Sequence, residues 1–188
     1  MKETIRTFIA IKIKAEKKLL DLIGDFKKSF AGEEIRWVNI DNLHITLRFL
    51  GETSQIRAVE IVKMLELIST KFQPFQFKLK GVSVFKRSSR PQVLLVQIEN
   101  DPVLKQLALE IDEMIKPLGF RPVESIFKPH LTLARIKYIQ NKGEFNSFVN
   151  RFGSSEIQTV TVSEIIFYQS ILGTDGPTYK AIKIVNLN

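Results

Sequence analysis

Two copies of one tetrapeptide stand out in this chain of 188 residues, and both of its histidines belong to them. His44-Ile45-Thr46-Leu47 and His130-Leu131-Thr132-Leu133 share the pattern histidine, apolar, threonine, apolar. Successive side chains of an extended strand alternate between its two faces, so each histidine and its threonine should project from one face and the apolar pair from the other. The sequence therefore predicts two strands that each carry one polar pair.

The spacing of the motifs indicates a chain built from two comparable halves. His130 follows His44 by 86 residues, a little under half of the 188-residue chain, as expected for an internal duplication. Hydrophobic periodicity and turn residues predict strands at residues 5–13, 44–50, 75–85, 93–98, 130–136, 156–168 and 178–187, and helices at residues 15–30, 54–73, 101–116 and 143–152. Gly51 should end the first motif strand. We expect an α+β fold, a bilobal pseudo-twofold arrangement of two antiparallel-sheet α/β lobes around a central cleft, with residues 1–188 as a single bilobal domain.

Composition is that of an ordinary globular protein. Apolar residues make up 44% of the chain and no run of 18 or more apolar residues is present, so we expect no membrane-spanning helix. The N-terminal residues alternate in the manner of a strand and lack the apolar segment of a signal peptide, which favours a cytoplasmic location. The absence of cysteine excludes disulfides, thiolate metal ligands and cysteine nucleophiles.

The charge balance favours an anionic partner. Lysine and arginine outnumber aspartate and glutamate by 28 to 20, and the net charge of +8 attracts polyanions over a long range. Nucleic acid is the obvious candidate. Many basic proteins bind no polyanion, however, so charge alone leaves both interpretations open.

The duplicated motif carries the side chains that phosphodiester hydrolysis needs. Histidine titrates near neutral pH, so two facing histidines could act as general acid and general base. The hydroxyls of Thr46 and Thr132 could donate hydrogen bonds to the non-bridging oxygens of a phosphate. Because catalytic zinc takes three protein ligands, two histidines without cysteine form a poor zinc site, and we predict no metal and no cofactor. One histidine on an apolar strand is usually structural, but the repetition argues against that role for both.

The sequence around both motifs resembles the two-histidine phosphoesterase superfamily. Within it, the chain is similar to the bacterial and archaeal RNA 2′,3′-cyclic phosphodiesterases, also called 2′-5′ RNA ligases. The resemblance rests on NLHITLRFLG at residues 42–51 and FKPHLTLAR at 127–135, and on RTFIA at 6–10, RWV at 36–38, GVSVF at 81–85, RPQVL at 90–94, YQS at 168–170 with Leu172, and GP at 176–177 with Tyr179. It extends over nearly the whole chain. Gln92 departs from it, because the family often has arginine there.

This resemblance implies that water opens a terminal 2′,3′-cyclic phosphate on RNA, leaving a 2′-phosphate and a free 3′-hydroxyl. By the same likeness His44 would be the proton donor to the departing 3′ oxygen, and His130 the proton acceptor that activates water. Thr46 and Thr132 would bind the phosphate. The family also places an arginine that flanks the motif near the phosphate, which points to Arg135. On a regular strand Arg135 would lie on the face opposite to Thr132, where a surface ion pair is the alternative.

Aromatic and basic residues outside the motifs are further candidates for RNA contact. Phe8, Trp37 and Phe85 could stack on a base, although each could equally belong to the core. The basic loop at residues 86–90 could follow the RNA backbone, or could simply be solvated. No chemical role follows from the sequence for the tyrosine and serine of the YQS stretch.

Two other functions stay open from the sequence. The same acid and base could join a cyclic phosphate end to a 5′-hydroxyl, as a 2′-5′ RNA ligase. No nucleotide-activating lysine motif or phosphate-binding glycine-rich loop is present, so such ligation would not use ATP, and excess water favours hydrolysis. The chain could also bind RNA ends or nucleotides without catalysis, which the intact histidines argue against. The expected partner is RNA with 2′,3′-cyclic phosphate ends, transfer RNA fragments being one candidate, and a monomer suffices for a site built from both halves.

Overall fold

The computed structural model describes residues 4–88, 90–99, 101–121, 127–174 and 176–188. The strands are β1 (Thr4–Lys12), β2 (Glu34–Trp37), β3 (His44–Ser54), β4 (Phe75–Arg87), β5 (Arg90–Ile98), β6 (His130–Tyr138), β7 (Glu156–Val162), β8 (Glu164–Gly173) and β9 (Gly176–Asn186). The α-helices are α1 (Lys17–Ser29), α2 (Gln55–Ser69), α3 (Pro102–Ile115) and α4 (Lys142–Arg151), and the short 3-10 helices are η1 (Ile40–Asn42) and η2 (Lys116–Leu118).

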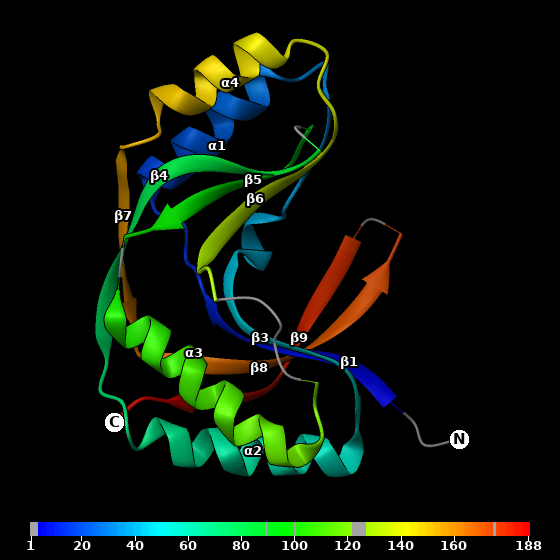
Figure 1. The fold of residues 1–188 in the computed structure, drawn as a ribbon, viewed down its shortest axis with the longest axis vertical. Coiled ribbons are helices and arrows are strands. Elements are labelled where there is room, and N and C mark those ends of the chain that lie inside the picture. Colours follow the sequence, from blue (N-terminus) through cyan, green and yellow to red (C-terminus); the bar gives the residue numbers. More distant parts are fainter. Residues whose placement is uncertain (1–3, 89, 100, 122–126, 175) are drawn as a thin grey trace.

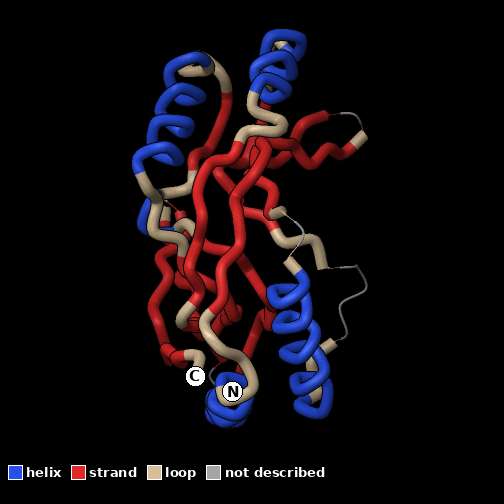
Figure 2. The backbone as a smooth tube through the Cα atoms, turned by 90° about the vertical axis from the view of Figure 1, so that its left-hand side faces the viewer, coloured by secondary structure: helices blue, strands red, loops and turns tan. Residues whose placement is uncertain are grey.

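Two antiparallel sheets form the two lobes of the molecule (Figure 1). One sheet has the strand order β3-β1-β8-β9 and the other the order β2-β6-β5-β4-β7. Helices α2 and α3 pack against the first sheet, α1 and α4 pack against the second, and the strands lie between the two helical layers (Figures 1 and 2). The motif strands β3 and β6 belong to different sheets and contact each other where the lobes meet. The predicted bilobal α+β class is therefore confirmed.

The helices pack on the sheets through regular apolar stripes. Helix α1, for example, buries Leu19, Leu22, Ile23 and Phe26, which is the spacing of one helical face. Most buried apolar side chains of both lobes form one continuous cluster, so the two sheets share a core. None of the helices in the described ranges is long and apolar enough to cross a membrane.

A bulge interrupts β3 directly after its motif. Thr46 and Arg48 pair with Ala10 and Ile9, which are neighbours in β1, so Leu47 is an extra residue on β3. Such a bulge changes which side chains share a face beyond it. Arg48 therefore lies on the buried face with Ile9 and not on the face of Thr46.

The same bulge follows the second motif. Thr132 and Ala134 of β6 pair with Leu95 and Leu94, neighbours in β5, so Leu133 is the extra residue. Exposure also follows the same order from each histidine onward: half-buried, buried, half-buried, buried, buried, exposed. The internal repeat thus extends from the side chains to the backbone of both strands.

The bulge at Leu133 corrects the placement of Arg135 that a regular strand would give. Arg135 pairs with Val93, whereas Thr132 pairs with Leu95, two positions away on β5. Residues two apart on a strand share a face, and paired residues project from the same face. The expected position of Arg135 opposite to Thr132 is therefore wrong, and both side chains lie on the same face of the sheet.

Three further features differ from the predicted elements. The strand predicted at residues 156–168 is two strands, β7 and β8, which are separated by Ser163 and belong to different sheets. Strand β3 continues through Gly51 to Ser54, because glycine adopts a φ of +73° there without steric cost. The edge strand β2 is absent from the predicted elements, because four residues are too short for a periodic pattern.

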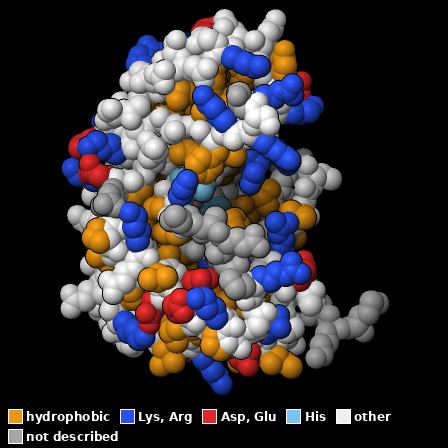
Figure 3. Space-filling view, in the orientation of Figure 1, with side chains coloured by type: hydrophobic (Ala, Val, Ile, Leu, Met, Phe, Trp, Pro, Cys, Tyr) orange, Lys and Arg blue, Asp and Glu red, His pale blue; other side chains and the backbone are white. Residues whose placement is uncertain are grey.

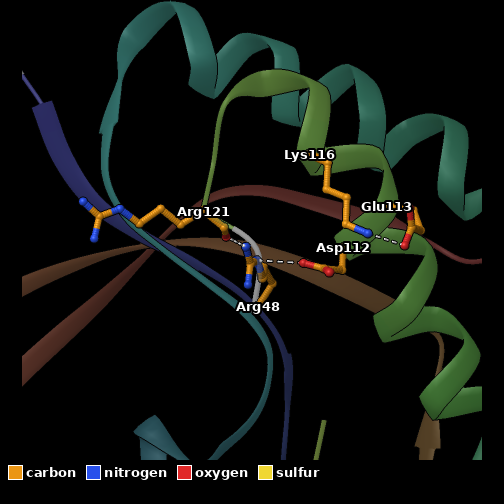
Figure 4. A network of polar contacts seen from close by, with 5 residues as sticks. All are labelled: Arg48, Asp112, Glu113, Lys116 and Arg121. Carbon is orange, nitrogen blue, oxygen red and sulfur yellow. Dashed lines mark hydrogen bonds and ion pairs between the residues drawn. The ribbon is translucent and has the colours of Figure 1, made fainter. Parts of the chain in front are cut away.

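The inward turn of Arg48 creates an ion pair between β3 and α3 (Figure 4). Its Nε lies 3.4 Å from Oδ1 of Asp112, and its Nη2 donates a hydrogen bond to the carbonyl oxygen of Arg121. The side chain of Arg48 is 7% exposed and that of Asp112 is 20% exposed. Arg48 therefore ties the first motif strand to α3 and to the segment that follows η2.

Candidate active site

A hollow lies between the lobes, and a histidine is visible inside it with lysine and arginine side chains around the rim (Figure 3). On the first lobe, His44 lies between two aromatic rings. Its ring centre is 5.1 Å from that of Phe8 and 5.1 Å from that of Tyr179, which it meets edge to face. Phe8 and Tyr168 belong to a small buried cluster separate from the main core, and Tyr179 packs against it. We call the face of each sheet that carries the motif histidine the cleft face.

A backbone carbonyl group just before each motif strand orients the histidine ring. Nδ1 of His44 lies 2.6 Å from the carbonyl oxygen of Asn42, and Nδ1 of His130 lies 2.8 Å from that of Lys128. A carbonyl oxygen can only accept, so Nδ1 carries the proton and donates in both rings. In the neutral form each Nε2 then has a lone pair that can accept a proton, and in the protonated form Nε2 can donate that proton.

The two histidines influence each other across the cleft. Burial lowers the pKa of His44, the hydrogen bond to Asn42 opposes this, and the charge of His130 lowers the pKa further. His130 is the first residue of β6, and its ring meets Phe85 edge to face at 4.8 Å. The structure thus brings both predicted histidines into one site, with an aromatic ring behind each.

Thr46 and Thr132 lie two residues beyond their histidines, before each bulge, so they share the cleft face as expected. Both are half-buried. Within the described residues neither hydroxyl has a hydrogen-bond partner in the protein. Both hydroxyls are therefore available to a ligand.

Arg135 of the second lobe lies near Tyr179 of the first lobe. Burial raises the pKa of the Tyr179 hydroxyl, and the charges of Arg135 and Arg6 oppose this, so both guanidinium groups lie near Tyr179 on the first lobe. No carboxylate in the described part of the chain pairs with Arg6 or Arg135. The surface ion pair considered for Arg135 is therefore not formed there, and its charge faces the site.

The aromatic candidates occupy different environments. Phe8 is only 3% exposed and supports His44 from within the small cluster, so it offers little surface to a ligand. Phe85 is 40% exposed beside His130. Phe49, which sequence reasoning missed, is 65% exposed and pairs with Phe8 on the cleft face, with ring centres 6.1 Å apart. Only the bulge places Phe49 on this face, and no feature of the sequence marks the bulge.

Other residues considered from the sequence lie outside the immediate site. Trp37 pairs with Ala134 on the core face of β6, and the Nζ of Lys27 on α1 lies 5.8 Å from its ring centre, so it does not face the cleft. In the basic loop at residues 86–90, Lys86, Arg87 and Arg90 are exposed, and residue 89 lies outside the described residues.

The residues described offer no group of three histidine, cysteine, aspartate or glutamate side chains that could hold a metal ion. The chemistry that this arrangement can supply itself is proton transfer by two imidazoles, hydrogen bonding by two hydroxyls, and charge stabilisation by arginine.

Comparison with known proteins identifies the family of the chain. The family described as LigT like phosphoesterase matches the chain twice, over residues 11–95 and 96–179, with one motif histidine in each half. A protein of Aeropyrum pernix named RNA 2′,3′-cyclic phosphodiesterase is 37% identical over 152 residues, 80% of this chain and 85% of that protein. A Methanocaldococcus jannaschii protein of the same name is 32% identical over 179 residues, 95% of this chain and 99% of its own length.

Solved structures show the same fold. TT0787 of Thermus thermophilus has a TM-score of 0.82 at 22% identity and covers 97% of this chain and 98% of its own. Escherichia coli LigT, in a crystal structure with 3′-AMP, has a TM-score of 0.73 at 26% identity and covers 99% of both chains. The resemblance inferred from the two motifs is confirmed, and the chain belongs to the LigT-like phosphoesterase family of the two-histidine superfamily.

Proposed function

We propose that this protein hydrolyses 2′,3′-cyclic phosphate ends of RNA to 2′-phosphomonoesters by two-histidine acid and base catalysis, without a metal ion. The observation that carries the proposal is the pair of imidazoles, each with Nδ1 committed to its own backbone and the two close enough to interact electrostatically. The names of the relatives support the substrate, and LigT of Escherichia coli crystallised with 3′-AMP supports nucleotide binding by this fold.

In the proposed reaction His130 acts as general base and His44 as general acid. Nε2 of His130 takes a proton from water, and the water oxygen forms a bond to phosphorus. The bond from phosphorus to O3′ breaks, and O3′ receives the proton held on Nε2 of His44. The products are a 2′-phosphate and a 3′-hydroxyl. A proton moves between the histidines through solvent to restore the starting state.

The remaining cleft residues stabilise the phosphate. The free hydroxyls of Thr46 and Thr132 donate hydrogen bonds to the non-bridging oxygens, and Arg135 opposes their growing charge in the transition state. The bound phosphate is an anion, so it raises the pKa of His44 and offsets the effect of burial on this ring. Phe49 and Phe85 present exposed rings on which a base could stack. Residues 1–188 act as one bilobal domain, and a monomer contains the whole site.

The test uses an oligonucleotide that ends in a 2′,3′-cyclic phosphate, incubated in EDTA with the parent protein, His44→Asn and His130→Asn. Asparagine retains a donor near the position of Nδ1 and lacks Nε2, so the variants separate proton transfer from folding, and circular dichroism checks the fold. We expect the parent to form a 2′-phosphate, as read by phosphorus NMR, and each variant to lose about 10²- to 10⁴-fold in rate.

Other outcomes would decide against the proposal. Turnover that survives both substitutions would exclude the two histidines as the acid and base. A parent protein that binds the oligonucleotide without turnover would indicate a binding module, and a 2′-5′ linked product from a 5′-hydroxyl RNA would indicate ligation.

A further inference from the structure

The far edge of β4 is open beyond the point where β7 ends. Strand β7 pairs with β4 only from Phe75 to Lys80. The next two backbone N–H groups are satisfied differently, because Gly81 donates to the carbonyl of Ser155 and Val82 to the carbonyl of Phe152. Strand β4 continues to Arg87, and no strand of the described residues pairs with this edge after Val82.

The open edge presents backbone donors at regular spacing. Because backbone groups of a strand alternate between its two edges, the N–H groups of Val84 and Lys86 point to the same side as that of Val82. These two N–H groups are about 6.6–6.8 Å apart along the strand. Backbone N–H groups are common ligands of phosphate oxygens in nucleic-acid complexes.

A groove runs beside these donors, between β4 and α4. Its volume is about 380 Å³, within the range of small-ligand sites, and Val84 and Lys86 line one side. The other side is formed by Asn146, Val149 and Asn150 of α4. Asn146 and Asn150 are four residues apart on one face of the helix, are exposed, and have no side-chain hydrogen bond within the described residues.

The groove and the active site lie on opposite faces of the same stretch of β4. Phe85, whose ring meets His130 at 4.8 Å, projects to the cleft, whereas its neighbours Val84 and Lys86 project to the other face and line the groove at the open edge. None of the described residues that line the groove is acidic. Lys86, Arg87 and Arg90 are exposed, and no carboxylate of the described residues pairs with them.

We propose that the groove between β4 and α4 binds the ribonucleotide on the 5′ side of the nucleotide that carries the cyclic phosphate. This proposal rests on the proposed function and extends it from the terminal nucleotide to the RNA strand. The N–H groups of Val84 and Lys86, together with the ammonium group of Lys86, contact the backbone phosphate. The two asparagine amides of α4 hydrogen-bond to the base edge.

An RNA strand fits this edge better than a peptide strand. A peptide that extends a sheet needs a row of paired backbone groups, whereas this edge offers two residues and is then flanked by cations. The excess of positive charge favours a polyanion, and the uncovered edge of β4 beside Phe85 lets its chain pass from His130 around the strand to the groove.

The test compares adenosine 2′,3′-cyclic phosphate with a dinucleotide that ends in the same cyclic nucleotide. The parent should show a higher kcat/KM for the dinucleotide. In the double variant Asn146→Asp/Asn150→Asp, the amide donors to the base are lost and two negative charges enter the groove that holds the phosphate, so the ratio of the two kcat/KM values should fall about tenfold. Asn188→Asp, which makes the same change at a distant exposed position, should preserve the ratio.

A binding measurement keeps the test independent of turnover. Titration calorimetry with the dinucleotide 2′-phosphate should show about tenfold weaker binding to the double variant, with the mononucleotide 2′-phosphate as reference. Equal affinity of the parent for both ligands, or equal losses for both in the double variant, would overturn the groove assignment. Absence of hydrolysis by the parent would overturn the proposed function and still leave the binding ratio to decide the groove.

Discussion

Phe49 and Arg135 occupy equivalent positions in the two lobes, because each is the fifth residue after its histidine and each follows a bulged leucine. The two bulges bring both side chains to the cleft face. One lobe therefore presents an exposed aromatic ring where the other presents a guanidinium group. The cleft is pseudo-symmetric in its backbone and in its histidines, but these two equivalent positions differ in charge.

Replacement of Arg135 should weaken phosphate stabilisation without affecting the fold. Arg135→Gln removes a charge that faces the cleft, and we expect kcat/KM for a cyclic mononucleotide to fall about 10- to 100-fold, the loss of one charge-assisted hydrogen bond. Because the side chain is exposed, the urea midpoint should not change. Lys137→Gln is the matched control on the same strand, since Lys137 pairs with Glu34. Equal losses in both variants would contradict a specific role for Arg135.

The pH dependence should reveal the environment of His44. Burial, reinforced by the charge of His130, lowers the pKa of His44 from its ordinary value of 6.5, so its imidazole should titrate below pH 6.5 in the free protein. The kcat/KM profile should be bell-shaped, because one imidazole must be protonated and the other neutral. Its acidic limb reports the lower of the two apparent pKa values, so it should lie below pH 6.5. In the kcat profile both limbs should move to higher pH, because the bound phosphate is an anion.

Proton NMR of the two imidazoles checks this prediction directly. In His130→Asn the electrostatic contribution is removed, and the pKa of His44 should rise towards 6.5. Titration of His44 above pH 6.5 in the parent would show that burial does not control its charge.

The ion pair between Arg48 and Asp112 should matter for stability only when one partner is removed. Arg48→Met leaves the carboxylate of Asp112 without its cation in a largely buried place, and the free energy of unfolding should fall by about 3 kcal/mol. The double variant Arg48→Met/Asp112→Leu should recover most of this loss, because it removes both charges. Urea unfolding measures each value. Lys17→Met, which breaks an exposed pair with Asp21, is the control and should be neutral.

Two glycines with positive φ should respond differently to alanine. Gly51 (φ +73°) has nothing within 4 Å of the position that a Cβ would take, so Gly51→Ala should cost only the backbone strain, about 1–2 kcal/mol. At Gly81 (φ +82°) a Cβ would lie 2.5 Å from the carbonyl oxygen of Gly153, and backbone atoms must move. Gly81→Ala should therefore be clearly less stable than Gly51→Ala in urea. Equal stabilities would mean that the backbone at Gly153 moves away from the new Cβ without lowering the free energy of unfolding.

The repeated motif made the two histidine strands and the two-lobed fold predictable. Alternation of side chains also placed Thr46 and Thr132 beside the histidines, because both lie before the bulges. For the residues after Leu47 and Leu133, the same alternation predicts the wrong face of the strand. A bulged leucine is as apolar as a regular core leucine, so the reversal of faces that exposes Phe49 and buries Arg48 leaves no mark in the sequence.

The boundary between β7 and β8 was hidden for a related reason. Residues 156–168 alternate almost without interruption, and only the tertiary structure shows that Ser163 separates strands of different sheets. Phe8 illustrates a different limit, because an aromatic residue on a strand is equally compatible with a stacking surface and with the buried support of His44 that the structure shows.

The hydrogen bonds of His44 and His130 to carbonyl groups two residues earlier have a consequence for motion. Each ring is oriented entirely within its own lobe, so the separation between the two Nε2 atoms depends on how the sheets are placed relative to each other. A small opening or closing of the lobes would change the distance between proton donor and proton acceptor while each ring kept its orientation. Because the two sheets share one core, the packing where β3 meets β6 sets this distance, so a core substitution at the lobe junction could change the rate without altering any group in the cleft.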